Sequence, residues 1–126
     1  MIKRTCLGLV SLWTFSSVAL ANSTVQDLMR QKLESAHAIL DALALEDFTK
    51  IEYHAKLLKE ISHATTWYKA DSEDFRHHAK SFQNSADYLA EQAKLRSLEG
   101  ASLGYIRVQL DCIECHKVVR AAKKAK

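Results

Sequence analysis

The stretch "FRHHAKSFQNSADYLAEQA", residues 75–93, carries apolar side chains at intervals that alternate between four and three residues. These positions are Phe75, Ala79, Phe82, Ala86, Leu89 and Ala93. Such intervals keep side chains on one face of an α-helix, because the helix completes a turn every 3.6 residues. Most of the residues between them are polar or charged. The stretch therefore predicts an amphipathic helix with one face directed toward a protein core.

Three further segments show the same periodicity. Their apolar positions are Met29, Leu33, Ala36, Leu40 and Leu43 in the first, Phe48, Ile51, Ala55 and Leu58 in the second, and Tyr105, Val108, Cys112, Cys115 and Val119 in the last. The chain has no proline and three glycines, and these two residues most often interrupt helices. Four long helices with short connections predict an all-α fold, an antiparallel up-down-up-down four-helix bundle over residues 22–126.

The ends of the helices carry their own signals. Ser23 or Thr24 can cap the first helix, and Asp71 or Ser72 can cap the third. Gly100 suits the left-handed position that commonly ends a helix. We therefore expect the third helix to end there and the last helix to follow.

The first 21 residues differ from the rest of the chain. A positive start, "MIKR", precedes the apolar stretch "LGLVSLWTFSSVAL", and "ALA" at 19–21 supplies small residues for a cut before Asn22. This pattern is typical of a cleaved secretory signal peptide, 1–21, with an uncleaved interfacial helix as the alternative. Cleavage leaves 16 basic and 15 acidic residues, a net charge of +1, because Lys3 and Arg4 are removed. We expect a periplasmic protein that binds neither nucleic acid nor, once cleaved, a membrane.

Cys112, Cys115 and His116 form "CIECH", residues 112–116, which matches the C-x-x-C-H motif of c-type haem attachment. Cleavage of the signal peptide also removes Cys6, so these are the two cysteines of the mature chain. Thiols three positions apart lie on one face of a helix, where both can form thioethers with the haem vinyl groups. His116 can then bind the iron as the proximal ligand. The motif predicts one covalently attached haem c.

Three other interpretations of the two cysteines are open. A redox dithiol usually lies at a helix start near a βαβ unit, but this motif lies near the end of the last predicted helix. A structural disulfide would suit an exported protein. A zinc site would need four ligands, and the other histidines show no suitable cluster. We favour haem, because export brings the chain to the compartment in which bacterial c-type haem is attached.

With C-x-x-C-H near the end of the last of four helices, the chain resembles the cytochrome c′ family of four-helix-bundle c-type cytochromes. Arg120 follows His116 by four positions, where the family has a basic residue beside the proximal histidine. Trp67 and the pair Phe82-Gln83 are also similar to the family pattern. The resemblance implies a five-coordinate iron whose open side can bind small gases such as NO and CO.

The first helix decides what faces the other side of the iron. In an up-down-up-down bundle its start lies beside the end of the fourth helix, so we expect Met29 and Leu33 on the distal side. The resemblance implies an apolar side chain there, and we favour Leu33 over Met29. Either Met29 or His37 could instead bind the iron, although packing is favoured for the first and a flanking polar position for the second. Three basic residues could pair with the haem propionates: Arg30, Lys32 and Arg120.

No arrangement of residues resembles a catalytic site, so we expect a protein that is not an enzyme. The remaining histidines are expected at the surface or the edge of the bundle: His54, His63, His77 and His78. The predicted function is electron transfer with redox partner proteins. The alternative is NO or CO binding at an open or displaceable distal site, for sensing or detoxification. The resemblance further implies a homodimer through the first two helices, for which Leu45 and Phe48 are candidates.

Overall fold

The computed structural model of the protein describes residues 24–66 and 72–124. Within these ranges there is no strand, and almost every residue belongs to one of four helices: α1 (Val25–Ala44), α2 (Phe48–Thr66), α3 (Glu73–Lys94) and α4 (Leu98–Lys124). The all-α prediction is confirmed. The predicted signal peptide, Ser23, Trp67 and Asp71 lie outside the described residues.

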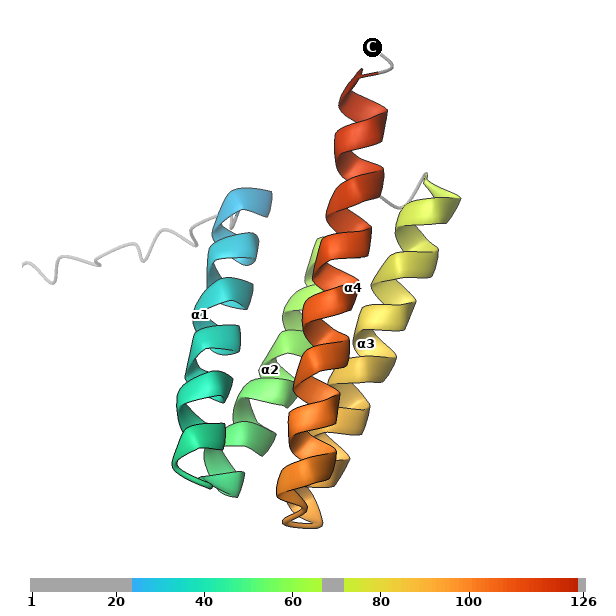
Figure 1. Cartoon of the computed structure of the whole chain (residues 1–126). Coiled ribbons are helices and arrows are strands. Elements are labelled where there is room, and N and C mark those ends of the chain that lie inside the picture. The colour runs from blue at the N-terminus through green and yellow to red at the C-terminus, as the bar shows by residue number, and fades with distance from the viewer. Residues whose placement is uncertain (1–23, 67–71, 125–126) are drawn as a thin grey trace, which may run out of the picture.

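The helices run alternately up and down and form a bundle (Figure 1). α1 packs on α2, α2 on α3 and α3 on α4, so neighbours in the sequence are neighbours in space. Short turns join α1 to α2 and α3 to α4, which makes each pair antiparallel. The predicted four-helix bundle is therefore confirmed. No helix within the described ranges is long and apolar enough to cross a membrane.

Side-chain caps determine where two of the helices begin. The Thr24 hydroxyl accepts a hydrogen bond from the Asp27 backbone N–H at 3.2 Å, and the Asp27 carboxylate accepts one from the Thr24 N–H at 3.0 Å. This reciprocal pair is a capping box. At the start of α3, Ser72 accepts a hydrogen bond from the Phe75 N–H at 3.2 Å. One of the two predicted caps is thus present at each helix.

The turn between α3 and α4 differs from the prediction. α3 ends at Lys94, and the residue with left-handed backbone is Arg96, with a φ of 56°. Gly100 lies in the first turn of α4, where a Cβ atom would meet the side chain of Gln92. The prediction for Gly100 is wrong because glycine serves here to let another residue approach, not to adopt a positive φ.

The core runs along the bundle, and every helix contributes to it. Its largest fully buried aliphatic side chains are Ile39, Ile51, Leu58, Leu89 and Val108. All six apolar positions of the stretch at 75–93 are buried, as predicted. α4 approaches α3 closely at Gly104, where a Cβ atom would lie 2.9 Å from the Leu89 Cα. The α3–α4 pair is therefore tightly packed.

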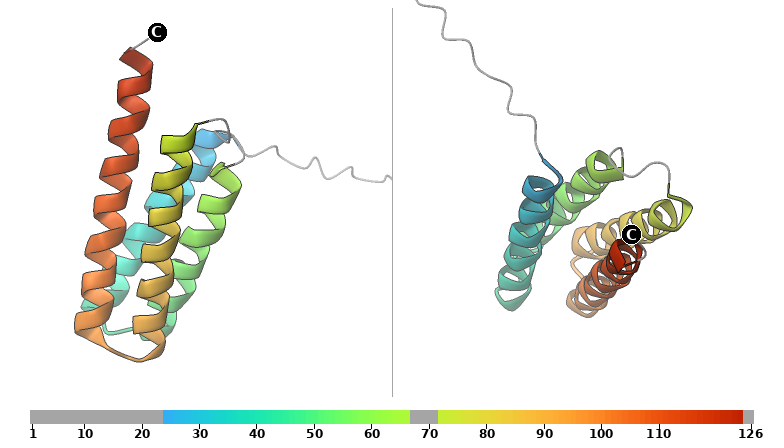
Figure 2. Two further views of the ribbon diagram at one scale, coloured as in Figure 1. Left: turned by 90° about the vertical axis from the view of Figure 1, so that its right-hand side faces the viewer. Right: turned by 90° about the horizontal axis from the view of Figure 1, so that it is seen from above.

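α1 turns a different face to the core from the one predicted. Leu33 and Leu40 are 57% and 55% exposed. The buried positions are Leu28, Ser35, Ala36, Ile39 and Ala42. α1 packs mainly on α2 and makes few contacts with α4, and the view from above shows α2 and α3 linking these two helices (Figure 2). The face toward α2 is therefore the buried one, and two overlapping apolar stripes on α1 made the choice ambiguous in the sequence.

Candidate functional site

A small apolar cavity lies at the end of the bundle where α1 and α3 begin and α2 ends. All four helices line it, including Met29 and Lys32 of α1, Thr65 of α2, His78 and Phe82 of α3, and Cys112 and Cys115 of α4. Its volume is about 40 Å³, enough for a few water molecules or a diatomic gas. The two cysteines of the predicted attachment motif therefore share one internal cavity.

The thiols of Cys112 and Cys115 reach this cavity from successive turns of α4. Both cysteines are free and partly buried. Burial raises the pKa of each thiol above its ordinary value of 9.0, and the Lys32 ammonium group opposes this shift. A reactive dithiol needs a lowered thiol pKa and an exposed position, so this environment weighs against the redox interpretation.

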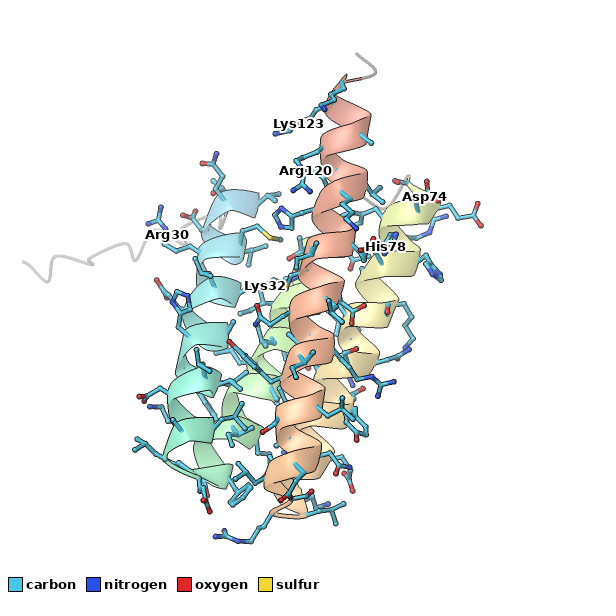
Figure 3. The ribbon with its side chains drawn as sticks, viewed as in Figure 1. Arg30, Lys32, Asp74, His78, Arg120 and Lys123 are labelled. Atoms are coloured by element: carbon cyan, nitrogen blue, oxygen red, sulfur yellow. The ribbon has the colours of Figure 1, made fainter. Side chains whose placement is uncertain are left out.

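His116 lies beside the cysteines on α4 but outside the cavity. Its side chain is exposed, because consecutive residues of a helix point about 100° apart and His116 directly follows Cys115. Arg120, one turn further on, is also exposed and extends from α4 on the side of α1 (Figure 3). The thiols thus face inward, and the imidazole stands at the rim of the same site.

Lys32 brings a positive charge to the wall of the cavity. Its Nζ atom lies 4.4 Å from the centre of the Phe82 ring, a cation–π contact between α1 and α3. Burial lowers the pKa of Lys32, and the nearby Cys112 and Cys115 act in the opposite direction. Figure 3 shows the side chain lying between α1 and α4. Lys32, which the sequence offers as a partner for a haem propionate, therefore forms part of the cavity wall.

The other candidates on α1 divide between the cavity and solvent. Met29 lines the cavity. His37 is exposed, and Arg30 is exposed on the outer side of α1, away from the cavity (Figure 3). The inward position predicted for Leu33 is wrong, because the buried face of α1 is turned toward α2. Met29 and Lys32, not Leu33, are the α1 side chains that meet this space.

His78 and Asp111 also line the cavity, although neither was a candidate for this site in the sequence. His78 was expected at the bundle edge, and the structure places it partly buried on α3. Asp111 accepts hydrogen bonds from the hydroxyl groups of Ser81 at 2.7 Å and Ser85 at 2.6 Å, which ties α4 to α3 beside Cys112. The spacing of Ser81 and Ser85 places both hydroxyl groups on one side of α3. The sequence does not show that they bind Asp111, which lies 30 and 26 residues further along the chain.

The donor set suits a c-type haem. Two thiols face an apolar space and an imidazole stands next to them, which are the groups that covalent attachment and axial ligation require. The cavity itself is much smaller than a porphyrin, so the macrocycle would need space now filled by side chains such as Met29 and Lys32. α1 and α4 make few contacts with each other. The bundle is therefore most easily opened between these two helices. Across residues 24–66 and 72–124, no three His, Cys, Asp or Glu side chains gather to hold a metal ion, so a zinc site finds no ligand set there.

Comparison of the chain with known protein families, with curated proteins and with solved structures returns no significant match. The resemblance to the cytochrome c′ family therefore stays a prediction.

Proposed function

We propose that the chain is an exported monohaem c-type cytochrome similar to the cytochrome c′ family. One observation carries the proposal: Cys112 and Cys115 face a single apolar cavity inside a four-helix bundle, with His116 directly beside them. The raised thiol pKa values and the position of the motif late in α4 support this reading over a redox dithiol.

The residues of α4 have distinct roles in this proposal. Cys112 and Cys115 would hold the haem through thioether bonds, each formed by addition of Sγ–H across one vinyl group. His116 would bind the iron through an imidazole nitrogen. Arg120, one turn away, offers a guanidinium group to a propionate or to a nearby carboxylate. When bound, the haem supplies one-electron transfer and an iron that can take up small ligands.

Electron transfer with periplasmic redox partner proteins is the function that this set of residues supports best. In this proposal the cofactor would be fixed covalently among apolar side chains, and His116 stands at a rim close to solvent. Electron transfer requires a short path to the surface, and this exposed edge offers one.

A second function, binding of NO or CO, is favoured by the wall of the cavity. Met29 and Phe82 make that wall apolar, which suits an uncharged diatomic ligand. His78 and Lys32 stand at the same cavity as potential hydrogen-bond donors to a bound gas. In this alternative the distal side of the iron is open, and the protein senses or removes the gas.

The first experiment tests covalent haem. The chain is expressed from its complete sequence together with a haem-attachment system, run on a denaturing gel and stained for haem peroxidase activity. We expect a stained band for the native chain and for Cys6→Ala, and no stained band for Cys112→Ala/Cys115→Ala. Covalent haem retained in the double variant, or none in the native chain, would contradict the proposal.

A second experiment separates the two functions. Absorption spectra of the reduced protein are recorded before and after addition of CO. A high-spin spectrum that changes fully with CO supports gas binding at an open iron. A low-spin spectrum that does not change when CO is added supports electron transfer, with a sixth ligand bound to the iron.

A further inference from the structure

The outward face of α4 carries a continuous stripe of exposed apolar side chains. Its members are Leu103, Ile106, Leu110 and Ile113, each a little over half exposed. The steps between them are three, four and three residues, so they lie along one side of the helix. The buried residues of α4 are Ala101, Gly104 and Val108. At 100° per residue, the stripe points away from the core that these buried residues face.

An exposed stripe of this kind needs an explanation. A helix at the surface of a bundle is normally apolar only on its inner face, and contiguous exposed apolar residues mark interaction surfaces. The same spacing continues to a charged residue at each end, Glu99 four positions before the stripe and Lys117 four positions after it. Both of these side chains are exposed. The stripe therefore has an acidic end and a basic end.

We infer that this stripe binds the same stripe of a second copy of the chain, with the two α4 helices antiparallel about a two-fold axis at the level of Val108. Along the stripe, the positions equidistant from residue 108 are complementary. Leu103 meets Ile113 of the other copy, and Ile106 meets Leu110. Glu99 meets Lys117 in the same way. An isologous interface needs such self-complementarity, and the four stripe residues with Glu99 and Lys117 have it.

The charges select the antiparallel direction. A parallel pair would place Glu99 against Glu99 and Lys117 against Lys117, which is unfavourable. Lys117 already contacts Glu114 of its own helix at 2.6 Å, but an ammonium group has three donors and can serve a second carboxylate. Arg107 lies near the proposed axis, and its guanidinium group is held 5.0 Å over the Tyr88 ring of α3. This contact keeps two like charges from meeting at the axis.

The competing candidate for a dimer is the face of the first two helices, where Leu33, Leu40, Leu45 and Tyr53 are exposed. Phe48 is 8% exposed and belongs to the core. Phe48 is therefore not available to a partner, and the expectation that it contributes to a dimer through α1 and α2 is wrong. Four large apolar residues and one ion pair per copy form an interface smaller than the usual 20–30 residues a side. We therefore expect a reversible dimer that dissociates on dilution. The inference does not depend on haem.

The test is sedimentation velocity of the purified full-length protein over a wide range of concentrations. Leu110→Lys is compared with Leu40→Lys, because Leu110 and Leu40 are 56% and 55% exposed and lie on different helices. We expect the native protein and Leu40→Lys to dimerise alike, and Leu110→Lys to dimerise at least tenfold more weakly. Circular dichroism checks that both variants keep the helical content of the native chain. A native protein that stays monomeric throughout, or equal weakening by both variants, would overturn the inference.

Charge reversal tests the direction of the two helices. Glu99→Lys and Lys117→Glu should each weaken the dimer, and the two together should restore it. A dimer indifferent to the single reversals would overturn the antiparallel arrangement. Neutral and anionic phospholipid vesicles are added in a parallel measurement. Monomeric native protein that binds vesicles through Leu110 would show that the stripe meets a lipid surface, which also overturns the inference.

Discussion

The Nζ atom of Lys32 lies 4.4 Å from the centre of the Phe82 ring, so an ammonium group of α1 is held against an aromatic ring of α3 inside the bundle. Cys112 and Cys115 line the same cavity. Burial lowers the pKa of Lys32, and the two nearby thiols oppose that shift. A positive charge therefore stands on the wall of the space proposed for the haem. Solvent screens a buried charge less than one at the surface, so the charge of Lys32 is expected to influence the cofactor strongly.

Lys32→Met should lower the reduction potential of the haem-loaded protein. Removal of a nearby positive charge favours the ferric state, which carries one more positive charge than the ferrous state. Arg30→Met is the matched control, because Arg30 is exposed on the outer side of α1 and solvent screens its charge. A redox titration measures both. Equal shifts in the two variants would show that Lys32 does not lie close to the haem.

Met29→Ala should accelerate CO binding to the reduced, haem-loaded protein several-fold. Met29 lines the cavity, and its truncation opens the approach from the distal side. Leu33→Ala should leave the rate unchanged, since Leu33 is 57% exposed. Flash photolysis gives both rates. A rate that changes in Leu33→Ala and not in Met29→Ala would indicate that Leu33 occupies the distal position.

Asp111→Ala should reduce the free energy of unfolding by about 2 kcal/mol. The change removes two hydrogen bonds to an ionised carboxylate, those from Ser81 and Ser85, that join α3 to α4. Asp87→Ala is the comparison, because Asp87 is exposed and its ion pair with Lys59 is worth less than about 1 kcal/mol. Urea unfolding followed by circular dichroism measures both losses. Similar values would mean that the serine pair contributes little.

Gly104→Ala should destabilise the protein by about 1–3 kcal/mol, because the new methyl group meets the α3 backbone at Leu89. Gly100→Ala should cost much less. The methyl group there meets the movable side chain of Gln92, and alanine favours the helix by up to about 1 kcal/mol. Thermal unfolding of the two variants checks the order. The reverse order would contradict the close packing of α3 on α4.

The haem-free chain should lose stability at alkaline pH through its cysteines. Folding raises the pKa of both thiols above 9.0. Their contribution is therefore complete below pH 9.0 and is lost as the pH rises through their pKa values in the folded state. Lys32 has the opposite sign, because burial lowers its pKa and its contribution to the free energy of unfolding rises with pH.

The control for this prediction is Cys112→Ala/Cys115→Ala, which keeps Lys32. Urea unfolding at about pH 8 and about pH 10.5 should show a larger loss of stability in the native haem-free chain than in the double variant. The same loss in both would mean that the thiols are not titrating in the cavity. In the native chain with haem attached, this additional loss of stability at alkaline pH should be absent, because thioether sulfur has no proton to lose.

Much of the fold could be predicted from local pattern. The alternation of four and three residues along Phe75, Phe82 and Leu89 marks a buried helical face, and all three side chains are buried. Thr24 and Ser72 cap helices as expected, because a cap depends on atoms within a few residues. The pairing of Cys112 with Cys115 on one side of α4 also follows from helix geometry alone.

The remaining features depend on which helices touch. α1 carries two overlapping apolar stripes, and only its packing against α2 decides that Ile39 is buried and Leu40 exposed. His78 and Asp111 join the cavity because α3 lies beside α4, a contact between residues far apart in the chain. The sequence by itself determined the four helices and the group of thiols and imidazole on α4, since both depend on spacing within a helix. Only the tertiary structure decided that Met29 and Lys32, rather than Leu33, face those thiols, because the rotation of α1 is set by contacts between helices.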